Sequence, residues 1–300
     1  MNKAHSPILL AQCKATHTAE EVAKLCDAFL TRSSQHGTPY ITVPYTLIDS
    51  MARKLNPNGS HIGAESLLDA NEGSFTVTVA GQMLKEIGAE FVLVGTQQER
   101  QFLKGNGQSL KNKIDLALKT GITPFLCIGE TLHEHHDEAS KTVLTDQLKI
   151  MIDGLSPKQL NGLTIVHDAA WIYQGLWEAD SKELQMAYQT FKDVVSEQFD
   201  PEVLSTLRLI PSIPVYSPSL AEIIIALQSP PFGFANFSFG VLDVSADKIQ
   251  PLTKVSTNQI QPTTEVIADP IQPTTEVITS DQGKPPPKRK RKPKATSSEE

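Results

Sequence analysis

The segment GSFTVTVAGQMLKEIGAEFVLVG, residues Gly73–Gly95, shows most clearly how helix-forming and strand-forming stretches alternate in this chain. Within it, Val79–Ile87 is an amphipathic stretch that predicts a helix, and Phe91–Val94 is a short apolar run that predicts a strand buried on both faces. A helix followed closely by a buried strand is typical of proteins built from repeated βα units.

The same alternation extends outward from this segment over about the first 250 residues. We expect strands at Pro7–Cys13, Tyr40–Val43, His61–Ala64, Phe91–Val94, Ile122–Ile128, Leu163–Val166, Leu207–Ile210 and Gly233–Phe237. We expect helices at Ala19–Leu30, Tyr45–Arg53, Val79–Ile87, Leu110–Lys119, Ala139–Ile152, Ser181–Gln198 and Leu220–Leu227, with a poorly marked last one at Val241–Leu252. Eight strands predict an α/β fold of the closed (β/α)8 barrel type. An open doubly wound sheet is the alternative, but no Gly-rich loop follows the first strand.

The end of the chain differs in composition from this body. Ile260–Ile267 and Ile271–Ile278 both read IQPTTEVI, and repeats of this kind bury no core. Residues 284–300 hold seven Lys or Arg and two Glu, a charge of +5; since the whole chain carries −7, the rest carries −12. We therefore predict a barrel at 1–253, a disordered linker at 254–283 and a disordered basic tail at 284–300. The tail is expected to contact polyanions or nucleic acid nonspecifically, because it has no aromatic side chain for base stacking.

Composition also excludes several classes of protein. No run of 18 apolar residues is present, so no membrane span is expected. The three cysteines, Cys13, Cys26 and Cys127, are odd in number and widely spaced, which argues against a disulfide framework or a zinc motif and favours the cytoplasm. The His-rich stretch at 133–137 has no i, i+4 His pair, so we expect neither a metal nor a cofactor.

Four motifs carry a resemblance to a known family. They are LLAQCK (Leu9–Lys14), the Gly73–Gly95 segment, ITPFLCIGETL (Ile122–Leu132) and VHDAAW (Val166–Trp171). Together they resemble triosephosphate isomerases over about residues 7–250. The resemblance implies a (β/α)8 barrel and the interconversion of dihydroxyacetone phosphate and glyceraldehyde 3-phosphate, a step of glycolysis and gluconeogenesis. That chemistry needs a carboxylate base, a neutral electrophile, a cation and backbone N–H groups that hold the phosphate.

The catalytic positions implied by the resemblance are only partly kept. Lys14 matches the cation of the family, although Gln12 replaces a usual Asn beside it. Asp168 stands where the family has its Glu base and is shorter by one methylene. The electrophilic His is missing: the family pattern Gly-His-Ser-Glu-Arg reads Gly95–Arg100 here, with one residue inserted and Thr96 at the His position.

The implied phosphate-binding segments are changed as well. The closing loop that contains Gly175 is one residue shorter than in the family. Ser212 follows Pro211, which has no N–H to donate, in place of a Gly-rich segment. Ser238 and Phe239 replace a Gly-Gly pair, and a Phe side chain would occupy space that a phosphate needs. These changes predict weak or absent isomerase activity and do not favour a small phosphorylated substrate.

Three functional hypotheses remain open. In the first, the barrel has lost most or all catalysis and serves as a binding or scaffold protein; Ser74–Thr78, including Thr76, resemble the dimer loop of the family, so a homodimer is expected. In the second, the protein is an active isomerase on this or another substrate, with Asp168 as base and Lys14 as electrophile. In the third, the basic tail is the working part and the barrel a carrier.

Two further residues carry structural expectations. Glu130 is expected to be structural and held by the backbone or an Arg. His167 is expected to point away from Asp168, because side chains alternate along a strand.

Overall fold

The computed structural model describes residues 8–13, 15–33, 38–70, 78–102, 107–173, 181–211 and 239–241. All of them belong to the first of two units into which the chain divides, Met1–Lys254 and Val255–Glu300. The predicted linker and basic tail, residues 254–300, lie outside the described residues.

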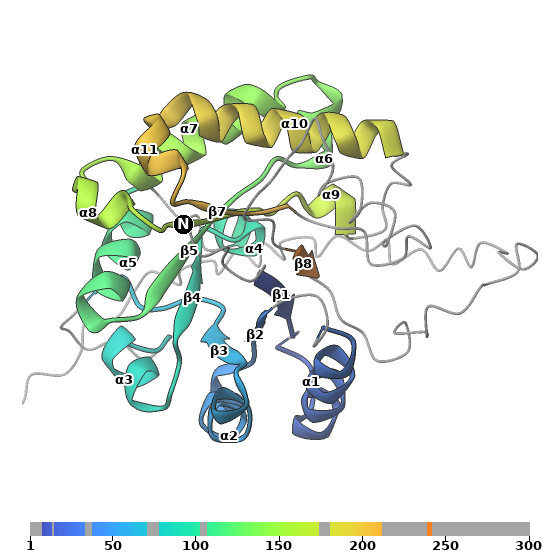
Figure 1. The fold of residues 1–300 in the computed structure, drawn as a ribbon, viewed down its shortest axis with the longest axis vertical. Coiled ribbons are helices and arrows are strands. Elements are labelled where there is room, and N and C mark those ends of the chain that lie inside the picture. The colour runs from blue at the N-terminus through green and yellow to red at the C-terminus, as the bar shows by residue number, and fades with distance from the viewer. Residues whose placement is uncertain are drawn as a thin grey trace, which may run out of the picture. The chain divides into compact units, whose positions relative to one another are not determined.

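Eight parallel strands form one sheet in the order β7-β6-β5-β4-β3-β2-β1-β8. They are β1 (Ile8–Gln12), β2 (Thr38–Thr42), β3 (His61–Ala64), β4 (Phe91–Val94), β5 (Thr123–Ile128), β6 (Thr164–His167), β7 (Arg208–Ile210) and β8 (Phe239–Val241). From β1 to β7, strands that are neighbours in sequence are neighbours in the sheet, and β8 pairs with β1 through Leu9 and Phe239. This order is that of the predicted (β/α)8 barrel (Figure 1).

Helices follow the strands, and the longer ones lie on the outside of the sheet (Figure 1). They are α1 (Ala19–Ser33), α2 (Ile48–Leu55), α3 (Gly81–Glu86), α4 (Gln97–Phe102), α5 (Gly107–Thr120), α6 (Leu132–His136), α7 (Ser140–Ile152), α8 (Pro157–Leu160), α9 (Ala170–Tyr173), α10 (Ser181–Gln198) and α11 (Pro201–Leu204), with 3₁₀ turns at Tyr45–Leu47 and Asn56–Asn58. α7 and α10 lie side by side (Figure 1). Within the described ranges, no helix is long and apolar enough to cross a membrane.

Side chains of the strands alternate between two buried clusters. The outer cluster fills the space between the sheet and the helices, and the inner one fills the barrel with Ile8, Leu10, Phe91, Leu93, Phe125, Cys127, Val166 and Ile210. Gly63 lies at this inner layer, where a Cβ would come within 2.5 Å of the Phe91 ring. The absence of a side chain at Gly63 therefore makes room for an aromatic ring inside the barrel.

The structure corrects some predicted elements. β3, β4 and α10 have the predicted bounds, and the other strands up to β7 differ by one or two residues at their ends. β8 lies at Phe239–Val241, where no strand was predicted, and the predicted strand at Gly233–Phe237 lies outside the described residues. Val241, the first residue of the predicted helix at Val241–Leu252, lies in β8 and does not start a helix. The rest of that predicted helix, and all of the one at Leu220–Leu227, lie outside the described residues.

Two predictions around the helices were also incomplete. The polar segment after β4, for which no helix was predicted, contains the helix α4. The predicted helix at Tyr45–Arg53 begins with a 3₁₀ turn at Tyr45–Leu47, and α2 continues it from Ile48.

Candidate active site

Three polar side chains share the inner face of the barrel at the carboxyl ends of its strands. The side chains of Leu10 and Val166 belong to the inner cluster. Gln12 is two residues after Leu10, and Asp168 is two residues after Val166. Glu65 follows Gly63 by the same spacing, at the end of β3. Since active sites of (β/α)8 barrels lie at this end, these positions form the candidate site.

Asp168 is buried and held on several sides. Its backbone N–H donates to the Ile128 carbonyl at 2.6 Å. Its Oδ2 accepts a hydrogen bond from the backbone N–H of Gln97, at the start of α4, and lies 4.0 Å from Nη2 of Arg100. Asp168 is therefore anchored between the ends of three neighbouring strands.

Arg100 links the same strand ends through their carbonyl groups. Its guanidinium donates to the Gly95 carbonyl, to the Cys127 carbonyl at 3.0 Å and to the Gly129 carbonyl at 3.0 Å. A planar group with several fixed donors suits this arrangement, which joins the ends of β4 and β5.

Thr96, the position of the missing His, caps the N-terminus of α4. Its carbonyl accepts the Arg100 N–H at 2.9 Å, and its hydroxyl oxygen accepts the Glu99 N–H at 3.3 Å. The Glu99 carboxylate in turn accepts the Gly95 N–H at 2.7 Å and pairs with Lys113. The hydroxyl of Thr96 is thus used to begin a helix.

Glu65 is a site residue that the sequence analysis missed. Its side chain hydrogen-bonds to Gln12, while its Oε1 atom is buried and has no hydrogen-bond partner among the described residues. Burial raises the pKa of Glu65 to about 7, although the bond to Gln12 acts in the opposite direction. The signal that could have found it is the continued alternation of His61, Gly63 and Glu65.

Glu130 is structural, and the predicted backbone hydrogen bond is present beside two side-chain partners that were not predicted. Its carboxylate accepts hydrogen bonds from Nε2 of His167 at 3.1 Å and from Nε1 of Trp171 at 3.0 Å. Burial would raise the pKa of Glu130, yet the charge of His167 and these two hydrogen bonds lower it to about 2. His167 also stacks on Phe191 of α10, so it points away from Asp168, as alternation predicts.

The His-rich stretch of α6 is engaged with carboxylates. His133 lies 3.3 Å from Asp137. His135 lies 3.0 Å from Glu183 of α10 and stacks on the Trp171 ring at a centroid distance of 4.0 Å. Through His135, α6 therefore contacts both α10 and Trp171 in the segment that follows Asp168.

The remaining predicted site residues lie outside the described residues. They are Lys14, Gly175, Ser212 and Ser238, together with Thr76 of the dimer-loop resemblance. Of the predicted residues, the structure places Gln12, Thr96 and Asp168 at the carboxyl ends of β1, β4 and β6.

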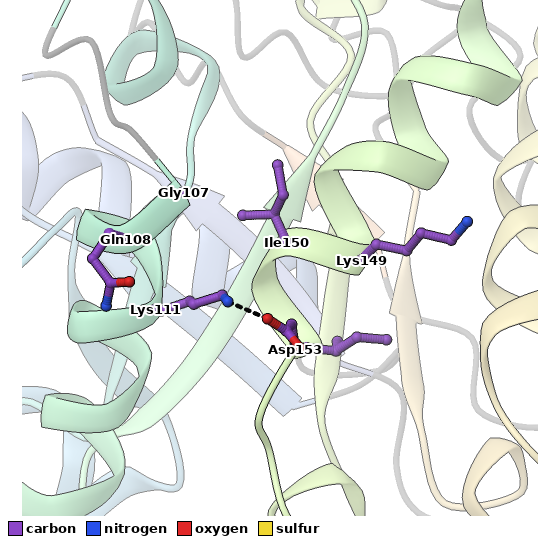
Figure 2. Close-up of a pocket in the computed structure, with 7 residues that line it drawn as sticks. Gly107, Gln108, Lys111, Lys149, Ile150 and Asp153 are labelled. Atoms are coloured by element: carbon purple, nitrogen blue, oxygen red, sulfur yellow. Dashed lines mark hydrogen bonds and ion pairs between the residues drawn. The ribbon is translucent and has the colours of Figure 1, made fainter.

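A separate hollow of about 580 Å³ lies between α5 and α7. Figure 2 shows Lys111 reaching from α5 to Asp153 at the end of α7, with Ile150 and Lys149 nearby. Its lining residues come from these two helices and the turn after α7, and it contains none of the candidate site residues.

Comparison with known proteins places this geometry in a family. The family model described as triosephosphate isomerase matches residues 7–222. Triosephosphate isomerases from Protochlamydia amoebophila and Symbiobacterium thermophilum are each 29% identical, over 68% of this chain and over 78% and 80% of their own lengths. The crystal structure of triosephosphate isomerase from Bartonella henselae shares the fold, with a TM-score of 0.62 at 22% identity over 79% of this chain and 92% of that chain. The chain belongs to the triosephosphate isomerase family.

Proposed function

We propose that this family member isomerises triose phosphates weakly or not at all, and that its barrel acts as a binding or scaffold protein. The observation that carries the proposal is the engagement of the Thr96 hydroxyl oxygen by the Glu99 N–H at the start of α4. The family reaction needs a neutral hydrogen-bond donor aimed at the substrate carbonyl. An aliphatic hydroxyl used as a helix cap is a far poorer match to an enediolate than the imidazole expected there.

The proposed base is also poorly placed for proton transfer. Asp168 is one methylene shorter than the Glu of the family pattern, and its Oδ2 accepts the Gln97 N–H and faces Arg100. A carboxylate held in this way lacks the reach that the longer side chain would give. Misplacement of a reacting group by about 1 Å costs on the order of 100-fold in rate.

The changed phosphate-binding segments also support the proposal. Pro211 follows β7 directly and is buried, so this position offers no N–H group to a phosphate. The remaining backbone donors to a phosphate would have to come from the segments that contain Gly175 and Ser212. Ser238, the third predicted position, precedes β8 in the chain instead of following it. With fewer backbone donors, less remote binding energy is available to orient a substrate at the reacting end.

A second candidate function keeps chemistry at the same face. Asp168 would act as base and Lys14 as electrophile, on triose phosphate or on another substrate. The observation that favours it is Glu65, whose pKa of about 7 lets a carboxyl hold or release a proton at neutral pH. A carboxyl in this state is suited to acid–base chemistry as well as to binding.

A coupled isomerase assay on purified full-length protein separates the two candidates. We expect the wild-type chain to show little or no turnover beyond that of Asp168→Ala, which serves as the control for contaminating host enzyme. Turnover comparable to that of an active triosephosphate isomerase, and abolished by Asp168→Ala, would support the second candidate and reject the first. Thr96→His, alone and with rebuilt phosphate loops, then tests whether activity can be restored stepwise.

The other parts of the chain have proposed roles of their own. We propose that residues 1–253 form the barrel and act in the cytoplasm as a homodimer, and that 254–283 link it to the basic tail at 284–300. The tail is proposed to bind polyanions nonspecifically, as its charge favours. Deletion of 284–300 should abolish binding to heparin at low salt, and sedimentation equilibrium gives the mass of the assembly.

A further inference from the structure

The fold brings two of the three cysteines together. Cys13 directly follows β1 and alternates with Gln12, so its side chain joins the outer cluster; Cys26 joins the same cluster from α1. Their exposed fractions are 2% and 1%, and the two thiols hydrogen-bond to each other. Cys127 is equally buried but belongs to the inner cluster, on the other side of the sheet.

The charges around this pair favour ionisation of one thiol over the other. The hydrogen bond from Cys13 lowers the pKa of Cys26 against the effect of burial, and Lys54 acts in the same direction while Asp27 opposes it. The same pairing, with burial and the neighbouring Glu65, raises the pKa of Cys13. Cys26 is therefore the thiol that becomes a nucleophile, and Cys13 is the thiol placed to react with it next.

We propose that Cys13 and Cys26 are an oxidation site that closes to an intramolecular disulfide when a peroxide reaches it. The Cys26 thiolate attacks one peroxide oxygen, which forms a sulfenic acid and releases water once the leaving oxygen is protonated. The Cys13 sulfur then attacks the Cys26 sulfur and displaces a second water. One peroxide is reduced to two waters, and two thiols are oxidised to one disulfide.

The position of the pair gives this reaction a consequence for the candidate site. Cys13 lies in the chain between Gln12, which holds Glu65, and Lys14, the proposed cation. A disulfide would tie this end of β1 to α1. The oxidation site therefore acts on the candidate site, although its formation does not depend on whether the barrel is an enzyme.

The test uses the full-length protein and hydrogen peroxide as the probe. Treated protein is denatured, its remaining thiols are alkylated, and tryptic peptides are analysed by mass spectrometry. Cleavage after Lys14, Lys24 and Arg32 puts the two cysteines on separate peptides. We expect these peptides to be joined, and to separate again on treatment with dithiothreitol, while Cys127 is recovered as an alkylated thiol.

Internal controls make either outcome informative. Met83 and Met186, 59% and 62% exposed, report whether the peroxide was active by their conversion to sulfoxides. Cys26→Ser should lose the joined peptides completely, and Cys127→Ser should keep them. The proposal is overturned if both methionines are oxidised in the wild-type chain while Cys13 and Cys26 remain alkylatable thiols or oxidise without joining.

Discussion

Replacement of Glu65 by Gln should stabilise the protein at alkaline pH and leave it unchanged in acid. Burial raises the pKa of Glu65 from 4.5 to about 7, and one pKa unit corresponds to about 1.4 kcal/mol. Between these two pH values the folded chain keeps a proton at Glu65 that the unfolded chain has lost. The free energy of unfolding therefore falls as pH rises through this window, by about 3 kcal/mol in total, and Gln, which carries no charge, avoids this loss.

Urea unfolding followed by circular dichroism at pH 4.5 and pH 8 measures this effect. We expect Glu65→Gln and the wild-type chain to differ little at pH 4.5, and the variant to be more stable by about 3 kcal/mol at pH 8. Glu86→Gln, on the exposed surface of α3, is the matched control and should show no such pH-dependent gain. Equal differences between variant and wild type at the two pH values would mean that burial does not raise the pKa of Glu65.

Three further changes test other parts of the structure by the same unfolding measurement. Glu130→Gln should lower the free energy of unfolding by about 3 kcal/mol at pH 7, because it leaves the buried His167 without its carboxylate. This loss of stability should shrink as pH falls from 4.5 towards 2, where Glu130 itself becomes protonated in the wild-type chain. A loss that does not change with pH would contradict the ion pair. Gly63→Ala should cost about 2 kcal/mol, because its Cβ meets the Phe91 ring, and an unchanged stability would mean that the ring has room to move. Thr96→Ala should cost about 1 kcal/mol through loss of the helix cap, whereas Thr96→Ser should retain most of the stability.

Much of the fold follows from local patterns in the sequence. Short apolar runs gave the bounds of β3 and β4, and amphipathic spacing gave those of α10. Alternation along β6 separated His167 from Asp168, since successive side chains of a strand face opposite sides. These features depend on neighbouring residues only, and a single sequence carries that information.

Features that depend on distant residues could not be predicted in the same way. α4 was missed because its polar sequence has no apolar face, and it is held by Arg100 contacts to the ends of β4 and β5. The partners of Glu130 come from later in the chain. Glu65 was missed because one Glu after a short strand looks like the start of a loop; its burial against Gln12 arises only when β1 and β3 share a sheet.

The most direct test of the central proposal follows the carbon-bound proton of the substrate itself. Dihydroxyacetone phosphate is incubated in D₂O with wild-type protein and with Asp168→Asn, and deuterium incorporation at the carbon beside the carbonyl is followed by NMR. This measurement detects enolisation even where no product is released. We predict rates of exchange that lie near background for both proteins and differ by less than tenfold between them. Exchange by the wild-type chain at least tenfold faster than by Asp168→Asn would show that Asp168 still removes the proton, and would contradict the proposed loss of catalysis.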